Sequence, residues 1–202
     1  MSFRKEQKIV VNENKIFEFQ KWLNSFNAKE IFKPRYVNSV YFDNNSFGMY
    51  KDSLEGTLPR KKIRFRTYGE IFNFVEELNK EIKISSVDGR FKKSKKIKDY
   101  INFFKNGFLD QEYGICFPVL NVVYKRRYFK IGKVRVTIDE NIIYKKINKT
   151  NLSFFCENET LKVIELKCAE DFDENKLIKN FPFDRKRFSK YCNGIEKIYK
   201  LN

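Results

Sequence analysis

Charged and apolar residues alternate with a period of two along several short segments of this chain, and that period limits the folds it can adopt. Between positions 60 and 66 every second residue is Arg or Lys, and Ile63 and Phe65 stand between them. Side chains two positions apart share one face of a β-strand, whereas a helix would spread them around its surface. The segment is therefore predicted to be a strand with one cationic face. The cationic set is Arg60, Lys62, Arg64 and Arg66.

Four further segments alternate in the same way, and their polar positions are almost only Arg, Lys and acidic residues rather than Ser and Thr. A half-buried antiparallel sheet that turns its charged face to water has the same period, so that interpretation stays open for each strand alone. Arginines two positions apart, however, suit bidentate contacts to phosphate from one wall of a site. The further polar sets are Arg4, Glu6 and Lys8; Glu81 and Lys83; Arg135, Thr137 and Asp139; and Glu165 and Lys167.

Strand signals dominate the chain, and turn residues separate them at short intervals. Many antiparallel strands joined by hairpins suggest a closed barrel or a sandwich. We expect an α+β fold with a closed antiparallel β-barrel of about eight strands, flanking helices and a C-terminal helix, in a single domain over residues 1–202. The expected strands cover 4–11, 37–42, 60–68, part of 70–84, 90–96, 119–130, 134–144 and 161–168. The expected helices cover 14–25, 47–54, 97–106, 173–181 and 187–199.

Composition and charge narrow the chemistry. The net charge of +16 favours polyanionic partners, although a compositional bias toward lysine would give many of the same surface charges. The chain has no His, which removes Ser-His and Cys-His nucleophiles and the commonest zinc ligand. Four cysteines without a CxxC pair indicate reduced thiols of a cytoplasmic protein. No stretch approaches the ~18 apolar residues of a membrane-spanning helix.

A barrel that closed with its charged faces inward would gather Arg and Lys side chains around one lumen. Unpaired buried charges are costly, so such a lumen would need an anionic ligand, and a phosphate chain matches the forked guanidinium groups. Glu165, with Glu81 and Glu6 as helpers, could then hold Mg²⁺ or Mn²⁺ through oxygen ligands. Each of these carboxylates could instead pair with a neighbouring Lys. Phosphoryl transfer depends on positioning and charge stabilisation, so it is compatible with a chain that lacks His.

Short motifs follow one another over nearly the whole chain, from about Arg4 to about Tyr199. They are Glu6-Gln-Lys8; Val40-Tyr41-Phe42-Asp43; the run from Arg60 to Gly69; Glu81-Ile-Lys83; Lys92-Lys93; Tyr124-Lys-Arg126; the run from Val134 to Asp139; Ile164-Glu165-Leu166-Lys167; and Phe188-Ser189-Lys190-Tyr191. An E-x-K strand is common by itself, so the ordered series is the informative feature. In order and content the series resembles the polyphosphate polymerase (VTC) domain, within the wider triphosphate tunnel metalloenzyme or CYTH-like fold.

The resemblance implies roles for individual residues. Arg64 and Arg66 match arginines that hold the donor phosphates, Lys190 matches a lysine that reaches the terminal phosphate, and Glu165 matches the metal ligand. The register after the turn at residues 86–89 leaves open whether Lys92 or Lys93 faces the site, and Lys93 is the residue we predict. The full expected set is Arg64, Arg66, Lys83, Lys93, Arg126, Arg135 and Lys190 for catalysis; Lys8, Arg60, Lys62 and Tyr41 for substrate binding; and Glu165, Glu81 and Glu6 for the metal.

These features predict a metal-dependent phosphotransferase that adds the γ-phosphate of ATP or another nucleoside triphosphate to inorganic polyphosphate, with Mn²⁺ or Mg²⁺ as cofactor. Two alternatives stay open: hydrolysis of tripolyphosphate or a nucleoside triphosphate, and polyphosphate binding without catalysis. Nucleic acid is not an expected partner, because no RNA- or DNA-binding signature accompanies the strand-alternating arginines. We expect a cytoplasmic protein that associates with membranes only through a membrane-protein partner, which would export the product.

Overall fold

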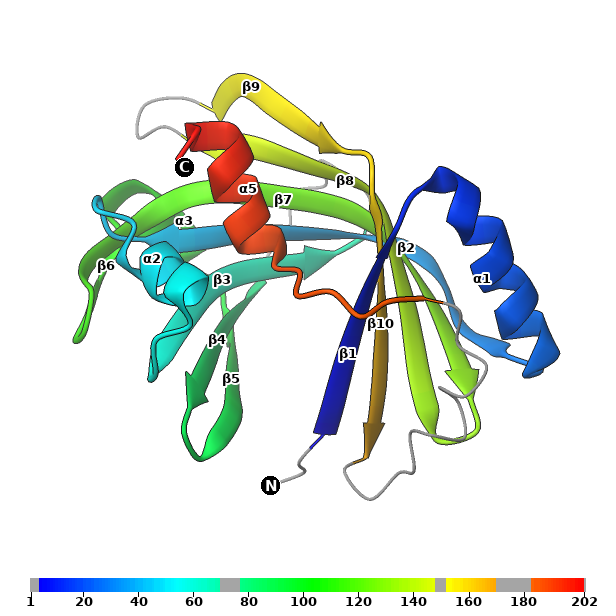
Figure 1. The fold of residues 1–202 in the computed structure, drawn as a ribbon. Helices are drawn as coiled ribbons and strands as arrows, with labels where there is room; N and C mark the ends of the chain where they lie inside the picture. Colours follow the sequence, from blue (N-terminus) through cyan, green and yellow to red (C-terminus); the bar gives the residue numbers. More distant parts are fainter. Residues whose placement is uncertain (1–3, 70–76, 148–151, 170–182, 202) are drawn as a thin grey trace. The chain divides into compact units, whose positions relative to one another are not determined.

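The computed structural model describes residues 4–69, 77–147, 152–169 and 183–201 (Figure 1). The chain forms two compact units. The first unit comprises Met1–Arg35, Tyr124–Ile142 and Glu159–Phe188, and the second unit comprises Tyr36–Val123, Ile143–Asn158 and Ser189–Asn202. Each unit therefore contains segments that lie far apart in the sequence.

Strands make up most of the described chain. Hydrogen-bonded neighbours follow the order β1-β10-β8-β7-β2-β3-β4-β5, with β6 beside β7 and β9 beside β8. Every strand pair whose register is defined is antiparallel. The strands are β1 (Arg4–Val11), β2 (Lys29–Asp43), β3 (Arg60–Tyr68), β4 (Leu78–Ser86), β5 (Gly89–Ile97), β6 (Phe108–Asp110), β7 (Gly114–Ile131), β8 (Val134–Ile147), β9 (Leu152–Glu159) and β10 (Lys162–Ala169).

The strand order has two ends, which corrects one part of the predicted fold. β1 and β5 each have one neighbouring strand, and no pairing within the described residues joins them. The predicted antiparallel α+β fold is confirmed, but the predicted closed barrel is replaced by an open strand order. β5 carries five cationic residues in nine positions. Such a density of Lys and Arg on an edge strand opposes pairing with a further strand.

In the first unit, helix α1 (Glu13–Ser25) packs on the apolar face of β1, β10 and β8. Ile164 lies opposite Ile9 of β1 and opposite Ile138 of β8, so the apolar residues of three strands form one layer. Phe19 of α1 is fully buried against this layer. The positions between these residues carry the polar side chains, and the predicted alternation is therefore confirmed for these strands.

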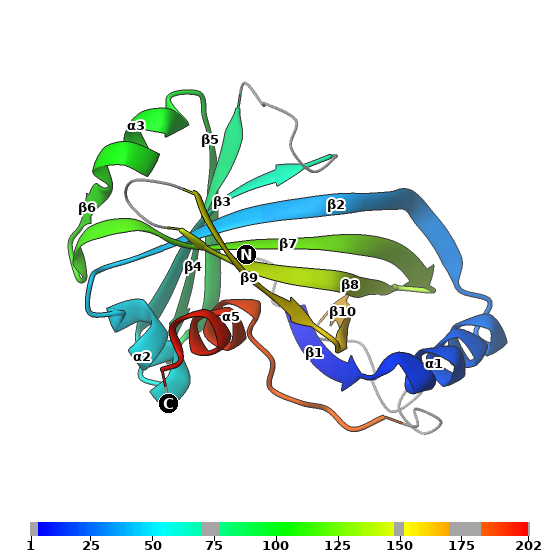
Figure 2. The ribbon, with the colours of Figure 1, turned by 90° about the horizontal axis from the view of Figure 1, so that it is seen from above.

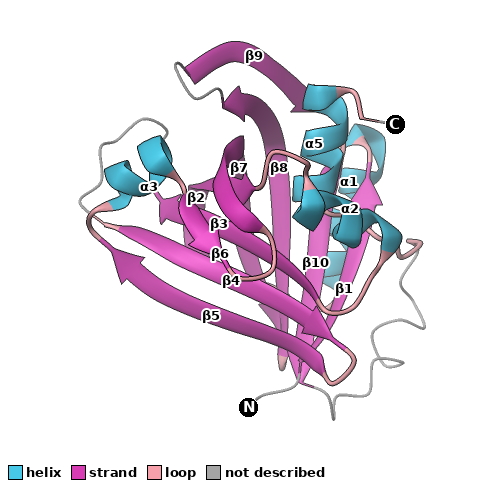
Figure 3. Cartoon of the chain, turned by 90° about the vertical axis from the view of Figure 1, so that its left-hand side faces the viewer, coloured by secondary structure: helices cyan, strands magenta, loops and turns pink. Residues whose placement is uncertain are grey.

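In the second unit, β3, β4 and β5 form an antiparallel meander, and Figure 3 shows β4 and β5 side by side. Ile63 of β3 lies opposite Ile82 of β4 on its apolar face. Helix α3 (Tyr100–Asn106) covers part of this face, because Phe103 and Phe104 make edge contacts with the ring of Phe65. The opposite face of the meander is left for the cationic side chains.

Helices α2 (Gly48–Glu55) and α5 (Lys190–Tyr199) contact each other in the second unit, and Figures 1 and 2 both show them together. Ser189 caps the N-terminus of α5, because its hydroxyl accepts a hydrogen bond from a backbone N–H of the first turn. A Cβ atom at Gly194 would lie 2.6 Å from the side chain of Leu120, so glycine permits the close approach of this helix. None of the described helices has the length and apolar content needed to cross a bilayer.

Several element boundaries differ from those predicted. β5 continues through a run of lysines between Phe91 and Ile97, two apolar residues that share one face of the strand. α3 therefore starts later than expected. β9 was not predicted, because its polar residues lack a clear alternation. The predicted helix at 173–181 lies outside the described residues. The observed starts are residue 29 for β2, residue 100 for α3 and residue 190 for α5, against predictions of 37, 97 and 187.

Replacing Phe19 by Ala should lower the free energy of unfolding by about 3–5 kcal/mol, because the fully buried ring would leave a cavity under α1. Phe17→Ala on the same helix is the matched control, since the Phe17 ring is 69% exposed. We expect the control to change stability by less than about 0.5 kcal/mol. Urea unfolding followed by circular dichroism measures both. Equal losses in the two variants would contradict this placement of α1.

Candidate functional site

The register of the meander gathers cationic side chains on one face of the second unit. Residues directly opposite each other in antiparallel strands share a face. Arg64 lies opposite Glu81, and Lys83 lies between Lys62 of β3 and Lys92 of β5. This surface, called the basic face below, carries eight cationic residues and one carboxylate. Its members are Arg60, Lys62, Arg64, Arg66, Lys83, Arg90, Lys92, Lys96 and Glu81.

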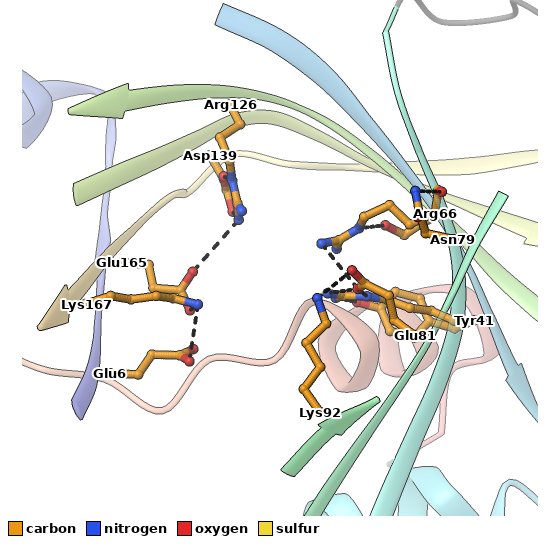
Figure 4. A network of polar contacts seen from close by, with 12 residues as sticks. Glu6, Tyr41, Arg66, Asn79, Glu81, Lys92, Arg126, Asp139, Glu165 and Lys167 are labelled. Atoms are coloured by element: carbon orange, nitrogen blue, oxygen red, sulfur yellow. Dashed lines mark hydrogen bonds and ion pairs between the residues drawn. The ribbon is translucent and has the colours of Figure 1, made fainter. Parts of the chain in front are cut away.

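Glu81 is held by cations from two strands (Figure 4). Its Oε2 accepts a hydrogen bond from Nε of Arg64 at 2.7 Å and lies 3.6 Å from Nη1 of Arg66. Its Oε1 lies 2.6 Å from Nζ of Lys92. Burial favours the neutral acid, but the charges of the two arginines and the hydrogen bond from the lysine outweigh it and lower the pKa of Glu81 to about 2. Glu81 is therefore ionised at neutral pH within the basic face.

Tyr41 of β2 lies beside Arg64, on the same side of the sheet as the basic face. It is opposite Arg64 in the strand register, and its hydroxyl accepts a hydrogen bond from Nη1 of Arg64 at 3.0 Å. Burial raises the pKa of Tyr41, but the charges of Arg64, Arg66 and Lys190 outweigh this effect and lower it to about 8. Lys190 directly precedes Tyr191, whose ring stacks on Tyr41, so the α5 lysine comes from the helix that packs on this point.

Two interactions fix the start of α5 in the second unit. The Tyr191 hydroxyl donates a hydrogen bond to the buried carboxylate of Asp43. Asp43 also accepts hydrogen bonds from the backbone N–H groups of Met49 and Tyr50 in the first turn of α2, each at 3.0 Å. Nζ of Lys62 donates to the hydroxyl of the N-cap residue Ser189 at 2.9 Å. These contacts orient the turn that carries Lys190.

The first unit has a second polar cluster, in which acids and bases are nearly balanced (Figure 4). Lys167 lies 3.2 Å from Glu165 and 3.4 Å from Glu6. Burial raises the pKa of Glu165, but the hydrogen bond with Glu6 and the charges of Lys167, Lys8 and Arg126 hold it well below its usual range. Glu165 is thus a buried carboxylate that stays ionised.

Arg126 joins this cluster from β7. Its guanidinium forms a bidentate pair with Asp139, with a 2.7 Å contact from Nη2, and the same nitrogen lies 3.9 Å from Glu165. Asp139 is almost fully buried, so this pair fixes the orientation of Arg126. Arg135 lies opposite Lys167 on the same face of the sheet but is exposed.

The carboxylates differ in their fit to a divalent metal. Within the described ranges, no three acidic or cysteine side chains gather closely enough to form a metal cluster. Mg²⁺ is commonly held by only one or two carboxylates together with substrate phosphates, and the buried Glu165 with the partly exposed Glu6 on the same polar face fits that requirement. Glu81 belongs to the second unit, where it contacts three cations. Its observed role is therefore that of a salt-bridge partner.

The structure brings most of the predicted residues into two groups. Arg60 lies on the basic face but donates hydrogen bonds to the backbone carbonyls of Gly56 and Thr57, which ties its side chain to the preceding loop. In the second unit the structure assembles Tyr41, Lys62, Arg64, Arg66, Glu81 and Lys83, with Lys190 nearby. In the first unit it assembles Glu6, Lys8, Arg126 and Glu165, with Arg135 on the same face.

One predicted residue lies on the wrong face. Lys93 is opposite Ile82 and therefore shares the apolar face of the meander, whereas Lys92 is opposite Lys83 and contacts Glu81. The strand register thus replaces Lys93 by Lys92 on the basic face. Asp43 was not among the predicted residues, although it stands two positions after Tyr41 in a quoted motif; the structure shows that it holds the starts of α2 and α5.

The family model for the VTC domain matches residues 3–113 and 109–199. No curated protein matches the chain. A candidate adenylate cyclase from Vibrio parahaemolyticus has a similar structure, with 12% identity, 99% of each chain covered and a TM-score of 0.54. A candidate adenylyl cyclase from Hippeastrum, described as having a dominant triphosphatase activity, is similar at 11% identity over 100% of this chain and 98% of that chain, with a TM-score of 0.56. At these identities the likeness shows the fold alone.

Glu81→Gln should destabilise the second unit by about 3 kcal/mol at neutral pH, because three cations lose their shared carboxylate. The folded-state pKa is depressed from 4.5 to about 2, so the stabilisation is complete above pH 4.5 and is lost as pH falls toward 2. Unfolding of both proteins measured over this pH range should show their stabilities converging. A difference that does not change with pH would contradict the assigned ionisation of Glu81.

Proposed function

This chain belongs to the VTC domain family, which confirms the resemblance seen in its motifs, and on that premise we propose that it is a polyphosphate polymerase. The enzyme would transfer the γ-phosphate of ATP to the end of an inorganic polyphosphate chain. The observation that carries the proposal is the basic face, where eight cations share one face of the meander with a single strand carboxylate. Such an excess of positive charge favours a ligand with many negative charges.

The basic face supplies what phosphoryl transfer requires of a protein. A terminal oxygen of the polyphosphate chain attacks the γ-phosphorus, the bond from that phosphorus to the β,γ-bridging oxygen breaks, and ADP leaves. Arg64 and Arg66 would hold the phosphates of the donor, and Lys190 would offset charge on the transferring group. No general base is needed when the nucleophile is already an anionic phosphate oxygen, which is compatible with a chain without His.

The cofactor in this proposal is Mn²⁺ or Mg²⁺. Glu165 would hold the ion with help from Glu6, since these two carboxylates lie on one polar face and Glu165 stays ionised. When bound, the ion would neutralise phosphate charge. Arg126 is fixed by Asp139 beside Glu165 and would bind phosphate oxygens there. A membrane-protein partner that exports the product completes the proposal.

The direct experiment mixes purified protein with ATP and Mn²⁺ and separates the products on a gel. Long phosphate chains are expected. Free phosphate without chains would support hydrolysis of the nucleoside triphosphate instead. Tight polyphosphate binding without any turnover would support a non-catalytic role. Either of these two results would overturn the proposed polymerase.

Arg64→Ala and Lys190→Ala should each abolish chain synthesis, because the donor phosphates lose a cation at the point where the strand and helix charges meet. We expect a loss of at least about a hundredfold, comparable to removal of one charge-stabilising donor. Rates come from the gel assay, and circular dichroism checks that the fold is retained. Normal synthesis in either folded variant would count against the proposal.

Lys92 and Lys93 provide a matched pair for this test, since adjacent residues of β5 lie on opposite faces. Lys92→Ala should reduce synthesis, and Lys93→Ala should leave it near the wild-type rate. The two variants lose the same charge from the same strand, so a general effect of net charge would affect them equally. Equal losses would show that the basic face is not the phosphate site.

Glu165→Gln should raise the Mn²⁺ concentration needed for half-maximal synthesis by about ten- to hundredfold, the effect typical of weakening a metal site. The change keeps the size of the side chain and removes the charge that a hard cation prefers. Glu13→Gln is the control, because the Glu13 side chain is exposed and pairs only with Lys162 among the contacts described. An unchanged metal requirement in Glu165→Gln would remove Glu165 from the metal site.

A further inference from the structure

Tyr41 occupies an unusual position for a phenol. Its side chain is buried, yet its hydroxyl lies on the basic face rather than in the apolar core. The ring stacks on Tyr191 of α5, with centroids 5.0 Å apart and an angle of 24° between the planes. Backbone pairing on one side and ring stacking on the other therefore hold the hydroxyl in place.

The charged groups that act most strongly on Tyr41 are cations, and they come from β3 and α5. β3 contributes Arg64, which donates to the hydroxyl, and Arg66; α5 contributes Lys190. On β4, Glu81 is bonded to the other nitrogens of Arg64. Two further charged groups contact Tyr191, the ring that stacks on Tyr41. Asp43 accepts a hydrogen bond from the Tyr191 hydroxyl, and Nζ of Lys62 lies 5.9 Å from the Tyr191 ring centroid.

The hydrogen-bond pattern leaves the Tyr41 proton available. Nη1 of Arg64 donates to the phenol oxygen, while Nε and Nη2 of the same guanidinium serve Glu81. The phenol is thus an acceptor in this bond, and its own hydrogen can point to a ligand on the basic face. A phosphate oxygen bound by Arg64 and Lys190 would be a suitable acceptor.

We propose that the Tyr41 hydroxyl is a direct ligand of the bound phosphate chain, and that the protein takes up one proton at this hydroxyl when phosphate binds. This inference rests on the proposed function, because it gives Tyr41, already expected to bind substrate, a specific bond to phosphate and a proton linked to binding. Without phosphate, the surrounding cations stabilise the phenolate, so in mildly alkaline solution the hydroxyl has lost its proton. Bound phosphate supplies the negative charge instead, so the phenolate oxygen accepts a proton from water and donates an O–H···O hydrogen bond to the phosphate.

The depressed pKa of Tyr41, about 8 against an ordinary value of 10, agrees with this environment in the free protein. Bound anions remove the cause of that depression, so the pKa should return toward 10. The proton uptake is therefore largest between pH 8 and pH 10. By linkage, phosphate affinity must fall as pH rises through this window. Well above the pKa of the free protein, the fall approaches about tenfold for each pH unit.

The test is a titration with tripolyphosphate, without metal, at a pH between 8 and 10. At pH 9, the middle of this window, the expected result is loss of about 0.8 phenolate per protein in the ultraviolet spectrum, together with uptake of about 0.8 proton in a weakly buffered solution. Burial raises the pKa of Tyr191 and raises that of Tyr199 to about 12, so these rings contribute little phenolate in the window. Tyr41→Phe should abolish both signals.

Tyr128→Phe is the matched control, because Tyr128 in the first unit also accepts a hydrogen bond from an arginine, at 2.9 Å from Nε of Arg35. It should leave the phenolate change and the proton uptake intact. The wild-type affinity for tripolyphosphate should fall more steeply with pH than the affinity of Tyr41→Phe, and the ligand's own titration affects both proteins equally.

The possible failures are distinguishable. Tripolyphosphate that binds without proton uptake or loss of phenolate would overturn the role of Tyr41 and leave the polymerase proposal standing. Wild-type protein that does not bind tripolyphosphate at all would contradict the phosphate site itself. If Tyr41→Phe fails to fold, the wild-type proton uptake measured beside the Tyr128→Phe control still decides the inference.

Discussion

The ion cluster around Glu81 is the interaction on which the second unit depends. Eight cations on one face of a three-stranded meander repel one another, and Arg66 is almost fully buried among them. One carboxylate that contacts three of these cations offsets part of that repulsion in the free protein. The remaining positive charge is the property that a polyanionic ligand would satisfy, so the same arrangement accounts for both the stability of the face and its proposed use.

The charges of the two units differ in a way that suggests different tasks. On the basic face, one acid stands among many bases, which suits binding of phosphate. In the first unit, Glu6, Asp139 and Glu165 are matched by Lys8, Arg126 and Lys167 in pairs and short networks. Such a balance fixes carboxylate positions without a large net charge, which suits a site for a divalent cation and its phosphate ligands.

Aromatic packing and a buried carboxylate connect the strands of the second unit to its helices. Asp43 binds the first turn of α2 and the hydroxyl of Tyr191, and Tyr191 in turn stacks on Tyr41. A local change at Asp43 would therefore move α5 as well as the end of β2. This link explains why two motifs that stand about 150 residues apart in the chain act at one point.

The sequence alone determined which residues share a face, because the period of two in a strand is a property of the backbone that tertiary contacts do not change. That is why Arg64 and Arg66 were predicted to share one face of their strand, and Glu81 and Lys83 one face of theirs. Tertiary structure decided how strands pair, and with it the choice of Lys92 over Lys93, since a shift of one residue exchanges the two faces. It also decided that the strand order is open and that Asp43 meets Tyr191, because contacts between distant segments depend on packing that no local pattern encodes.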